Sequence, residues 1–160
     1  MPQDREPADF YDPQHYAAEE SVGYLMRRVL LSLTHQTGRL LEPDGLTHAQ
    51  WGPLFKLFYG SATTVAELAR QLEMDPGAMT RLLDRLEAKG LCRRVRSESD
   101  RRVVNVELTP EGSAVAERIP VALSKVMNAH LAGFSRDEWG QLKDFLRRIL
   151  DNGVARRDEP

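Results

Sequence analysis

Apolar residues recur three and four positions apart in several long stretches of the chain. The pattern from Ser21 to Leu41 predicts a long helix, which Pro43-Asp44-Gly45 ends. Similar stripes predict helices over 111–132 and 136–152, and Gly153 is the expected end of the second. The chain is therefore expected to be mainly helical.

Three shorter helices are predicted between the long ones, each from a start signal. Thr47 and Thr64 are each followed three residues later by Gln or Glu, which is the capping-box pattern. Asp75 is a natural N-cap, and the φ angle of Pro76 suits the first position of a helix. Gly90 supplies the left-handed stop of the third helix. The apolar stripe of this third helix consists of Met79, Leu82, Leu83 and Leu86.

Two short strands are predicted over 91–96 and 102–108, because polar and apolar residues alternate in the second segment and a polar turn separates the two. A winged helix-turn-helix has this order of elements: a short helix, a tight turn, a capped helix and a hairpin. We assign this motif to 46–109. The long helices within 16–45 and 110–153 carry apolar stripes that so small a domain cannot cover, so a second copy of the chain is the expected cover. The predicted fold class is mainly α with a small β-hairpin wing, a winged helix-turn-helix with N- and C-terminal dimerisation helices.

Charge is unevenly distributed, although the formal net charge is only −2. Residues 1–20 carry six acidic residues and one basic residue, and the segment 1–15, with three prolines, is expected to be a flexible arm. Residues 76–102 carry eight basic and four acidic residues. This concentration of positive charge indicates a nucleic-acid partner, with a solvated basic surface as the alternative.

The helix that begins after Asp75 has the features of a DNA-recognition helix. Opposite its apolar stripe, small residues allow close approach to a duplex, and Thr80, Arg81 and Arg85 can reach bases or phosphates. Arg81 is the expected bidentate partner of a guanine. The alternative is that the arginines only pair with Asp84 or with solvent. The predicted DNA-binding residues up to the end of this helix are Thr64, Gly77, Ala78, Thr80, Arg81 and Arg85.

The predicted hairpin adds a second basic element. A two-stranded wing that carries arginine can enter the minor groove of DNA. Asp100 is unfavourable beside phosphates, so we expect it to hold the wing tip by bonding turn amides and pairing with Arg102. A solvated hairpin with a mixed-charge turn is the alternative. The predicted DNA-binding residues of the hairpin are Arg94, Arg96, Ser99, Asp100, Arg101 and Arg102.

The run from Asp100 to Gly112, with D-x-R, alternating apolar residues and L-T-x-x-G, resembles the wing signature of the MarR (multiple antibiotic resistance regulator) family. Residues 64–69 and 80–91 are similar to the two DNA-binding helices of that family, and the likeness spans about 20–152. The resemblance implies a homodimer in which the first and last helices interdigitate. It also implies a bacterial transcriptional regulator, a repressor, that binds a pseudo-palindromic site in double-stranded DNA.

Members of this family often bind small phenolic or aromatic anions between the dimerisation helices and the winged domain, and then lose affinity for DNA. The resemblance therefore implies an aromatic effector site. Its expected lining is Met26, His35, Arg39, Trp51 and Phe55. The alternative is that the aromatic and methionine side chains belong to the core and that His35 is a solvated surface residue.

The sequence contains few signals for a disulfide, a metal site, a cofactor or an enzyme active site. Cys92 is the only cysteine, which excludes an internal disulfide and makes the cytoplasm the expected location. We expect Cys92 to be a small buried hydrophobic residue, with oxidant sensing as the alternative. The four histidines form no metal-ligand pattern, and the chain has no cofactor or enzyme motif. A winged-helix module that binds protein without specific DNA binding is the remaining alternative to a regulator.

Overall fold

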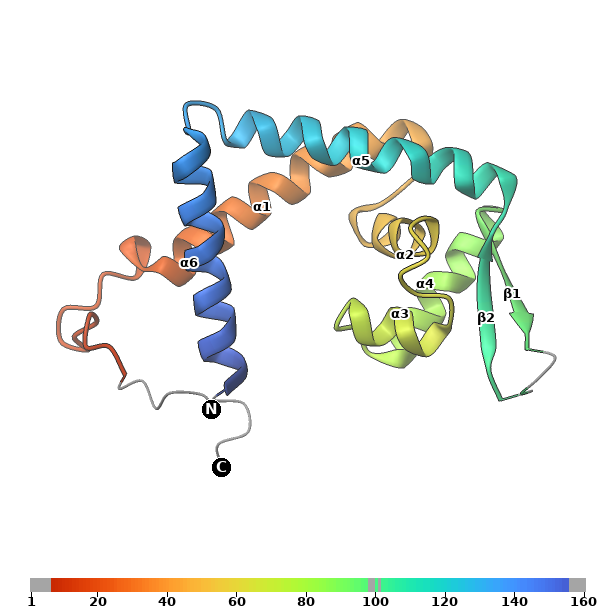
Figure 1. Ribbon diagram of the computed structural model, residues 1–160, viewed down its shortest axis with the longest axis horizontal. Coiled ribbons are helices and arrows are strands. Elements are labelled where there is room, and N and C mark those ends of the chain that lie inside the picture. Colours follow the sequence, from red (N-terminus) through yellow and green to blue (C-terminus); the bar gives the residue numbers. More distant parts are fainter. Residues whose placement is uncertain (1–6, 98–99, 101, 156–160) are drawn as a thin grey trace. The chain divides into compact units, whose positions relative to one another are not determined.

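The structure is a computed structural model that describes residues 7–97, 100 and 102–155. It confirms the predicted fold class: the described residues form a mainly helical chain with a two-stranded antiparallel hairpin (Figure 1). The elements are η1 (Ala18–Glu20), α1 (Val22–Leu41), η2 (Glu42–Asp44), α2 (His48–Phe58), α3 (Val65–Gln71), α4 (Pro76–Ala88), β1 (Cys92–Arg96), β2 (Val104–Leu108), α5 (Pro110–His130) and α6 (Arg136–Ala155).

The described residues of the ranges 1–28 and 128–160 form one compact unit, and those of 29–127 form another. The second unit contains a hydrophobic core to which α2, α3, α4, the hairpin and the adjoining parts of α1 and α5 contribute. The predicted stripe of α4 is confirmed, because its four members are at most 2% exposed: Met79, Leu82, Leu83 and Leu86. Burial of each such side chain stabilises the fold by about 1.5–3 kcal/mol.

The start signals of the short helices act as the sequence predicts. In α3 the N–H of Glu67 donates to Thr64 Oγ1 at 3.1 Å, and the Glu67 carboxylate accepts from the N–H of Thr64, also at 3.1 Å. In α4 the N–H of Ala78 donates to Asp75 Oδ1 at 2.9 Å. Gly90 follows α4 with a φ of +70°, the left-handed conformation that ends a helix. The caps satisfy amides that have no partner within their own helix.

The end of α6 corrects one prediction. The helix continues through Gly153 to Ala155, so the expected stop at Gly153 is wrong. A glycine ends a helix when its backbone turns to positive φ, and Gly153 is not among the glycines that do so.

At the other end of the chain, Tyr11 Oη accepts the N–H of Val22 at 3.0 Å, so part of the predicted arm contacts the start of α1.

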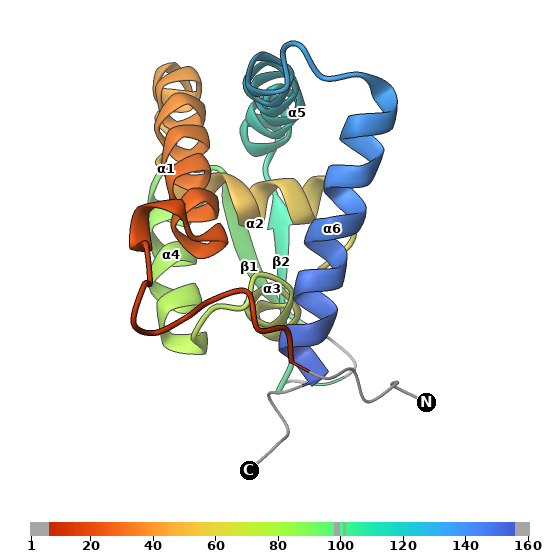
Figure 2. The ribbon, with the colours of Figure 1, turned by 90° about the vertical axis from the view of Figure 1, so that its left-hand side faces the viewer.

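The hairpin is connected directly to the segment that precedes α3. β1 and β2 pair antiparallel, with Arg94 opposite Val106, and the Val106 side chain is buried. The N–H of Val106 donates to the carbonyl of Thr63 at 2.8 Å, and Thr64 forms an isolated bridge with Asn105. β1 lies beside α4, and β2 is anchored at the start of α3 (Figure 2).

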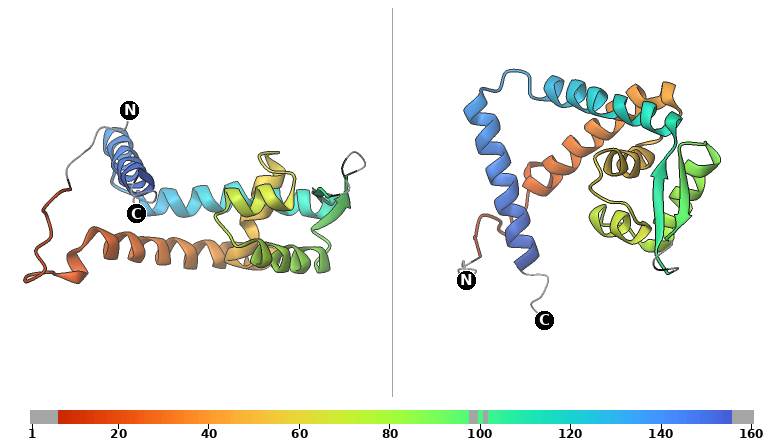
Figure 3. Two further views of the ribbon diagram at one scale, coloured as in Figure 1. Left: turned by 90° about the horizontal axis from the view of Figure 1, so that it is seen from below. Right: turned by 45° about the vertical axis from the view of Figure 1, so that its right-hand side comes forward.

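The L-T-x-x-G motif locks the base of the hairpin against α5, which follows β2 directly (Figure 3, right). Thr109 Oγ1 donates to the carbonyl of Gly90 at 2.6 Å and accepts the N–H of Gly112 at 2.9 Å. A Cβ atom placed on Gly112 would lie 1.7 Å from the carbonyl oxygen of Leu91. Glycine is therefore required at this position by the close approach of two backbones, and the motif acts as a packing device.

The long helices carry large apolar side chains that the chain itself leaves exposed. In the unit of residues 1–28 and 128–160, Leu25 is 52% exposed and Leu150 is 67% exposed. Other exposed apolar residues of α1, α5 and α6 are Val22, Met26, Val29, Leu30, Leu31, Leu40, Val121, Met127, Trp139, Phe145, Leu146, Ile149 and Val154. Within the described residues, no helix has the length and apolar character that crossing a membrane requires.

Candidate DNA-binding surface

The outward face of α4 presents polar side chains, as predicted. Thr80, Arg81 and Arg85 are exposed, and within the described residues neither arginine forms an ion pair. Arg81 Nη1 lies 3.5 Å from the place where a Cβ on Gly77 would stand, so the guanidinium lies back over the first turn of the helix. Thr80 Oγ1 donates to the carbonyl of Pro76 at 3.0 Å. The face therefore combines a small residue, a hydroxyl and two unpaired cations, a composition that suits a major groove.

Two residues of the predicted DNA-binding set have structural contacts at the starts of helices. Thr64 accepts the N–H of Glu67 through its side chain, and Ala78 gives its N–H to the Asp75 cap. The Glu67 carboxylate also accepts the N–H of Thr63 at 2.8 Å, and these backbone bonds hold its pKa below the ordinary value. DNA contact by Thr64 and Ala78 stays a prediction.

Arg94, which the sequence places among the DNA contacts, is bound to two carboxylates of α4 in this structure, and its contact with DNA stays a prediction. Its Nε donates to Glu87 Oε2 at 2.8 Å, and its Nη2 donates to Glu87 Oε2 at 2.5 Å and to Asp84 Oδ1. The backbone N–H of Arg94 donates to Glu87 Oε1 at 2.7 Å. The Arg94 and Glu87 side chains are 27% and 29% exposed, and the guanidinium lowers the pKa of Glu87. In this structure Arg94 holds β1 against α4, and its charge is already neutralised.

At the wing tip, the expected partnership of Asp100 with Arg102 is present. Asp100 Oδ1 accepts the backbone N–H of Arg102 at 3.0 Å and its Nε at 3.2 Å. These bonds hold the pKa of Asp100 below its ordinary value, the backbone bond being the larger cause. Arg102 is 91% exposed, so its outer nitrogens are accessible to a phosphate. Ser99 and Arg101 lie outside the described residues.

The remaining hairpin arginines differ from each other. Arg93 pairs across the hairpin with Glu107, with Nη2 to Oε2 at 2.7 Å. Arg96 is exposed at the end of β1, and it has no ion pair in the part of the chain that the structure describes. Among the predicted wing cations that the structure describes, Arg96 is therefore the one without an ion pair.

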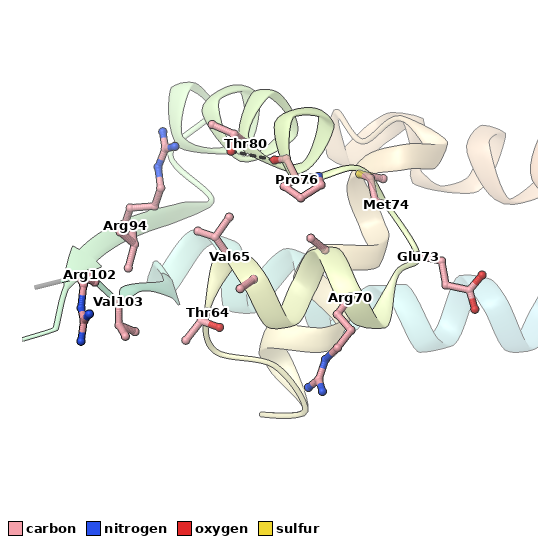
Figure 4. Close-up of a pocket in the computed structure, with 13 residues that line it drawn as sticks. Thr64, Val65, Arg70, Glu73, Met74, Pro76, Thr80, Arg94, Arg102 and Val103 are labelled. Carbon is pink, nitrogen blue, oxygen red and sulfur yellow. Dashed lines mark hydrogen bonds between the residues drawn. The ribbon is translucent and has the colours of Figure 1, made fainter. Parts of the chain in front are cut away.

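A hollow of about 860 Å³ lies between α3, the start of α4 and the hairpin, and Figure 4 shows the side chains around it. Polar groups on its rim come from Thr80, Arg94 and Arg102, with Val65 and Val103 among the apolar residues. Its full lining is Thr64, Val65, Ala66, Ala69, Arg70, Glu73, Met74, Pro76, Thr80, Arg94, Arg102, Val103 and Val104. Predicted DNA-binding residues from the helices (Thr64 and Thr80) and from the hairpin (Arg94 and Arg102) therefore lie around the same hollow.

Arg70 is a residue of this surface that the sequence reasoning missed. It lies in the last turn of α3, it is exposed, and it lines the hollow. The available signal was the helix phase, because Arg70 follows the buried pair Leu68 and Ala69 and falls on the opposite side of a short helix.

Cys92 is buried, with 3% exposure, which confirms the predicted buried residue. Burial raises the pKa of the Cys92 thiol to about 11, the Glu87 carboxylate adds to the rise, and Arg94 opposes it. A thiol with this pKa is protonated at neutral pH and is a poor nucleophile. Among the described residues, no group of His, Cys, Asp and Glu has the arrangement of a metal site.

That these five residues line an effector site stays a prediction. Trp51 and Phe55 pack edge to face on α2 with ring centroids 6.1 Å apart, and Trp51 Nε1 is buried without a hydrogen-bond partner among the described residues. His35 and Arg39 lie on α1 in the unit of residues 29–127, whereas Met26 belongs to the other unit. Trp51 and Phe55 pack against the core, in agreement with the alternative interpretation of these two side chains.

Two helices joined by a tight turn, the polar face of the second helix and the adjoining hairpin define a winged helix-turn-helix DNA-binding protein. Residues 46–104 match the sequence profile of the MarR family. The chain is 32% identical over 128 residues to the multiple antibiotic resistance protein MarR of Salmonella typhimurium, covering 77% of this chain and 89% of that protein. It is 34% identical over 119 residues to the HTH-type transcriptional repressor MdtR of Bacillus subtilis, covering 74% of this chain and 76% of that protein.

A solved structure has the same fold and contains DNA. It is a mutant MarR from E. coli complexed with operator DNA, with a TM-score of 0.72 and 30% identity, and the match covers 80% of this chain and 92% of that one. The chain belongs to the MarR family of transcriptional regulators. It is accordingly a DNA-binding regulator and not an enzyme, which confirms the family resemblance found in the sequence.

Proposed function

We propose that the chain is a transcriptional repressor that binds a pseudo-palindromic operator as a homodimer in the bacterial cytoplasm. The observation that carries the proposal is the outward face of α4, where Arg81 and Arg85 are exposed and free of carboxylates among the described residues. Such a face can read base edges in a major groove, and an arginine bound to guanine contributes about 1–3 kcal/mol of discrimination.

The exposed apolar side chains of the long helices support the homodimer. Leu150 and Val154 of α6 are more than 60% exposed, as is Leu30 of α1. Exposed apolar side chains in this number are typical of an interaction surface, and a second copy of the same chain is the commonest partner for one. A dimer with two-fold symmetry presents two recognition helices, which is why the operator is expected to be a pseudo-palindrome.

The repressor role is supported by the relative from Bacillus subtilis whose name is transcriptional repressor MdtR. We also propose release from DNA by a small aromatic or phenolic anion bound near Trp51 and Phe55. Trp51 Nε1 is buried and has no hydrogen-bond partner within the described part of the chain, so it is the donor that such a ligand would satisfy. Titration of the operator complex with salicylate-like compounds tests this part, and an unchanged complex with every compound would contradict it.

The main experiment selects bound sequences from random duplex DNA with the purified 160-residue chain. We expect a pseudo-palindromic consensus, and an affinity that falls steeply with salt. If the dimer makes about eight phosphate contacts, log K against log salt has a slope near −7. No enriched sequence together with a flat salt response would instead favour a winged-helix module that binds protein.

Arg81→Ala sharpens this experiment. It should relax the base preference at one position of each half-site, and Lys125→Ala is the matched control because Lys125 is an exposed cation on α5. An Arg81→Ala variant that selects the wild-type consensus would show that Arg81 does not read a base.

A further inference from the structure

The turn that joins α1 to α2, residues 41–46, has a fixed shape. The N–H of Leu46 donates to the carbonyl of Leu41 at 3.2 Å, and the N–H of Gly45 donates to the carbonyl of Glu42 at 2.8 Å, which is a Schellman arrangement. Gly45 has a φ of +69°, and Leu41 and Leu46 are buried at 1% and 4% exposure. The carbonyl of Gly45 is therefore held in one direction.

Lys89 reaches this turn from the end of the recognition helix, where it is the C-cap residue of α4. Its Nζ donates to the carbonyl of Gly45 and, at 2.7 Å, to Gln50 Oε1. Gln50 is 2% exposed, and the same oxygen accepts the N–H of Thr47 at 3.1 Å. Two of the three protons of the ammonium group are thus directed at fixed acceptors of the α1–α2 connection.

Arg118 reaches the same turn from α5. Its Nε and Nη2 donate to Asp44 Oδ1 at 2.8 and 2.5 Å, and its Nη1 donates to the carbonyl of Ala114 in its own helix at 2.9 Å. The Asp44 side chain is only 15% exposed. The turn is therefore held on one side by α4 and on another by α5, through two cations that are far apart in the sequence.

We propose that Lys89 and Arg118 are positioning residues that fix the angle at which α4 is presented to DNA, and that Lys89 makes no phosphate contact. α1 and α5 are among the long helices that the proposed dimer uses, so the turn of residues 41–46 connects the dimer to the recognition helix. The inference thus rests on the proposed function. It removes Lys89 from the count of DNA-binding charges, although Lys89 lies within the basic stretch of residues 76–102.

The test compares Lys89→Met and Asp44→Asn with Lys125→Met, an exposed cation of α5 that serves as the charge control. The operator selected by the wild-type chain is offered with its natural spacing and with one base pair inserted between the half-sites. We expect both test variants to lower the preference for natural spacing by about tenfold, within the range for residues that couple two sites without touching a ligand. Lys125→Met should keep the wild-type preference.

The salt dependence separates positioning from phosphate contact. Loss of one phosphate contact per protomer reduces the slope of log K against log salt by about two for a dimer, whereas a positioning residue leaves the slope unchanged. Asp44→Asn adds a second criterion, because removal of a negative charge should strengthen DNA binding if charge alone matters. A Lys89→Met variant with a reduced slope and the wild-type spacing preference would overturn the proposal.

A DNA-free measurement keeps this inference distinct from the proposed function. Spin labels on Arg85→Cys and Ser124→Cys, both at exposed positions within residues 29–127, report the distance between α4 and α5 in one protomer. Cys92 is buried, so we expect it to stay unlabelled. We expect a broader distance distribution after Asp44→Asn or, if Lys89→Met folds poorly, after Arg118→Gln. An unchanged distribution in a folded variant overturns the inference, while failure of the wild-type chain to select DNA overturns only the proposed function.

Discussion

The recognition helix and the wing both carry arginines, and the two regions use them differently. On α4, Arg81 and Arg85 are exposed and form no ion pair within the described residues. On the hairpin, Arg93 pairs with Glu107, Arg94 with Asp84 and Glu87, and Arg102 with Asp100. The two arginines of α4 therefore remain free of ion pairs among the described residues, whereas the wing uses most of its described cations to keep its own shape.

The difference shows that the number of basic residues in a stretch of sequence does not give the number of cations that are free to bind DNA. A paired arginine has part of its charge cancelled and its donors occupied, so it gains less from a phosphate than a free one. Arg94 is the clearest case, since it is half-buried between two carboxylates of α4. The quantity that matters for DNA binding is the positive charge that remains after the internal ion pairs have formed.

The largest expected change in stability comes from Gly112→Ala. This substitution disturbs the packing at the base of the hairpin and changes no residue on the outward face of α4. The added methyl group would lie 1.7 Å from the Leu91 carbonyl oxygen, so the backbones must separate. We expect a loss of about 3 kcal/mol in the free energy of unfolding, measured by chemical denaturation. The control is Gly140→Ala on α6, where no atom lies within 4 Å of the new Cβ. It should stabilise the chain by about 0.5–1 kcal/mol, and equal effects at the two glycines would refute the packing argument.

A matched pair of substitutions, Arg94→Met and Arg81→Met, tests the comparison directly. Arg94→Met leaves the partly buried Glu87 without its cation, and we expect a loss of about 1–2 kcal/mol in the free energy of unfolding. Arg81→Met should change stability by less than about 0.5 kcal/mol but should weaken discrimination between bases. The measurements are denaturation and operator binding at several salt concentrations. If Arg94→Met is as stable as the wild type and lowers the salt slope, then Arg94 is a DNA contact after all.

The pH dependence of stability gives a smaller effect from the same cluster. Hydrogen bonds from Arg94 lower the pKa of Glu87 in the folded chain, so the carboxylate stabilises the fold above its unfolded pKa, about 4.3. This stabilisation is lost as the pH falls through the lower, folded pKa. We expect the difference in unfolding free energy between the wild type and Glu87→Gln to be constant from pH 7 to about 5 and to shrink below about 4.3. A difference that grows on acidification would mean that the carboxylate is not held in its charged form.

Much of the fold could be predicted because its signals are local. The buried stripe of α4 follows from 3.6-residue periodicity, and the Asp75 cap and the Gly90 stop are decided by residues next to each other in the chain. The interpretation of Asp100 also succeeded, since its partner Arg102 is two residues away. Local geometry is enough in each of these cases.

The contacts that were missed join residues across turns and between helices. Arg94 meets Asp84 only because the chain reverses at Gly90, and Lys89 meets Gln50 across 39 positions. Periodicity places each of these side chains on a helix or strand, but it does not state which of several carboxylates or carbonyls faces it. The pairing of Arg94 with carboxylates of α4 and the place of Arg70 beside the hairpin could therefore not be predicted from periodicity alone.

The smallest expected effect is at the wing tip, where two variants of Asp100 separate shape from charge. An asparagine at this position keeps the oxygen that accepts the N–H of Arg102 and loses the ion pair, so Arg102 is freed while the turn is kept. We expect Asp100→Asn to bind operator about twofold more tightly, in the range of one exposed ion pair, with a slightly steeper salt slope. Asp100→Ala loses the turn as well as the charge, so its affinity should fall below that of the wild type. If both variants gain affinity equally, the wing tip needs no fixed shape to bind, and Asp100 acts only by repelling phosphate.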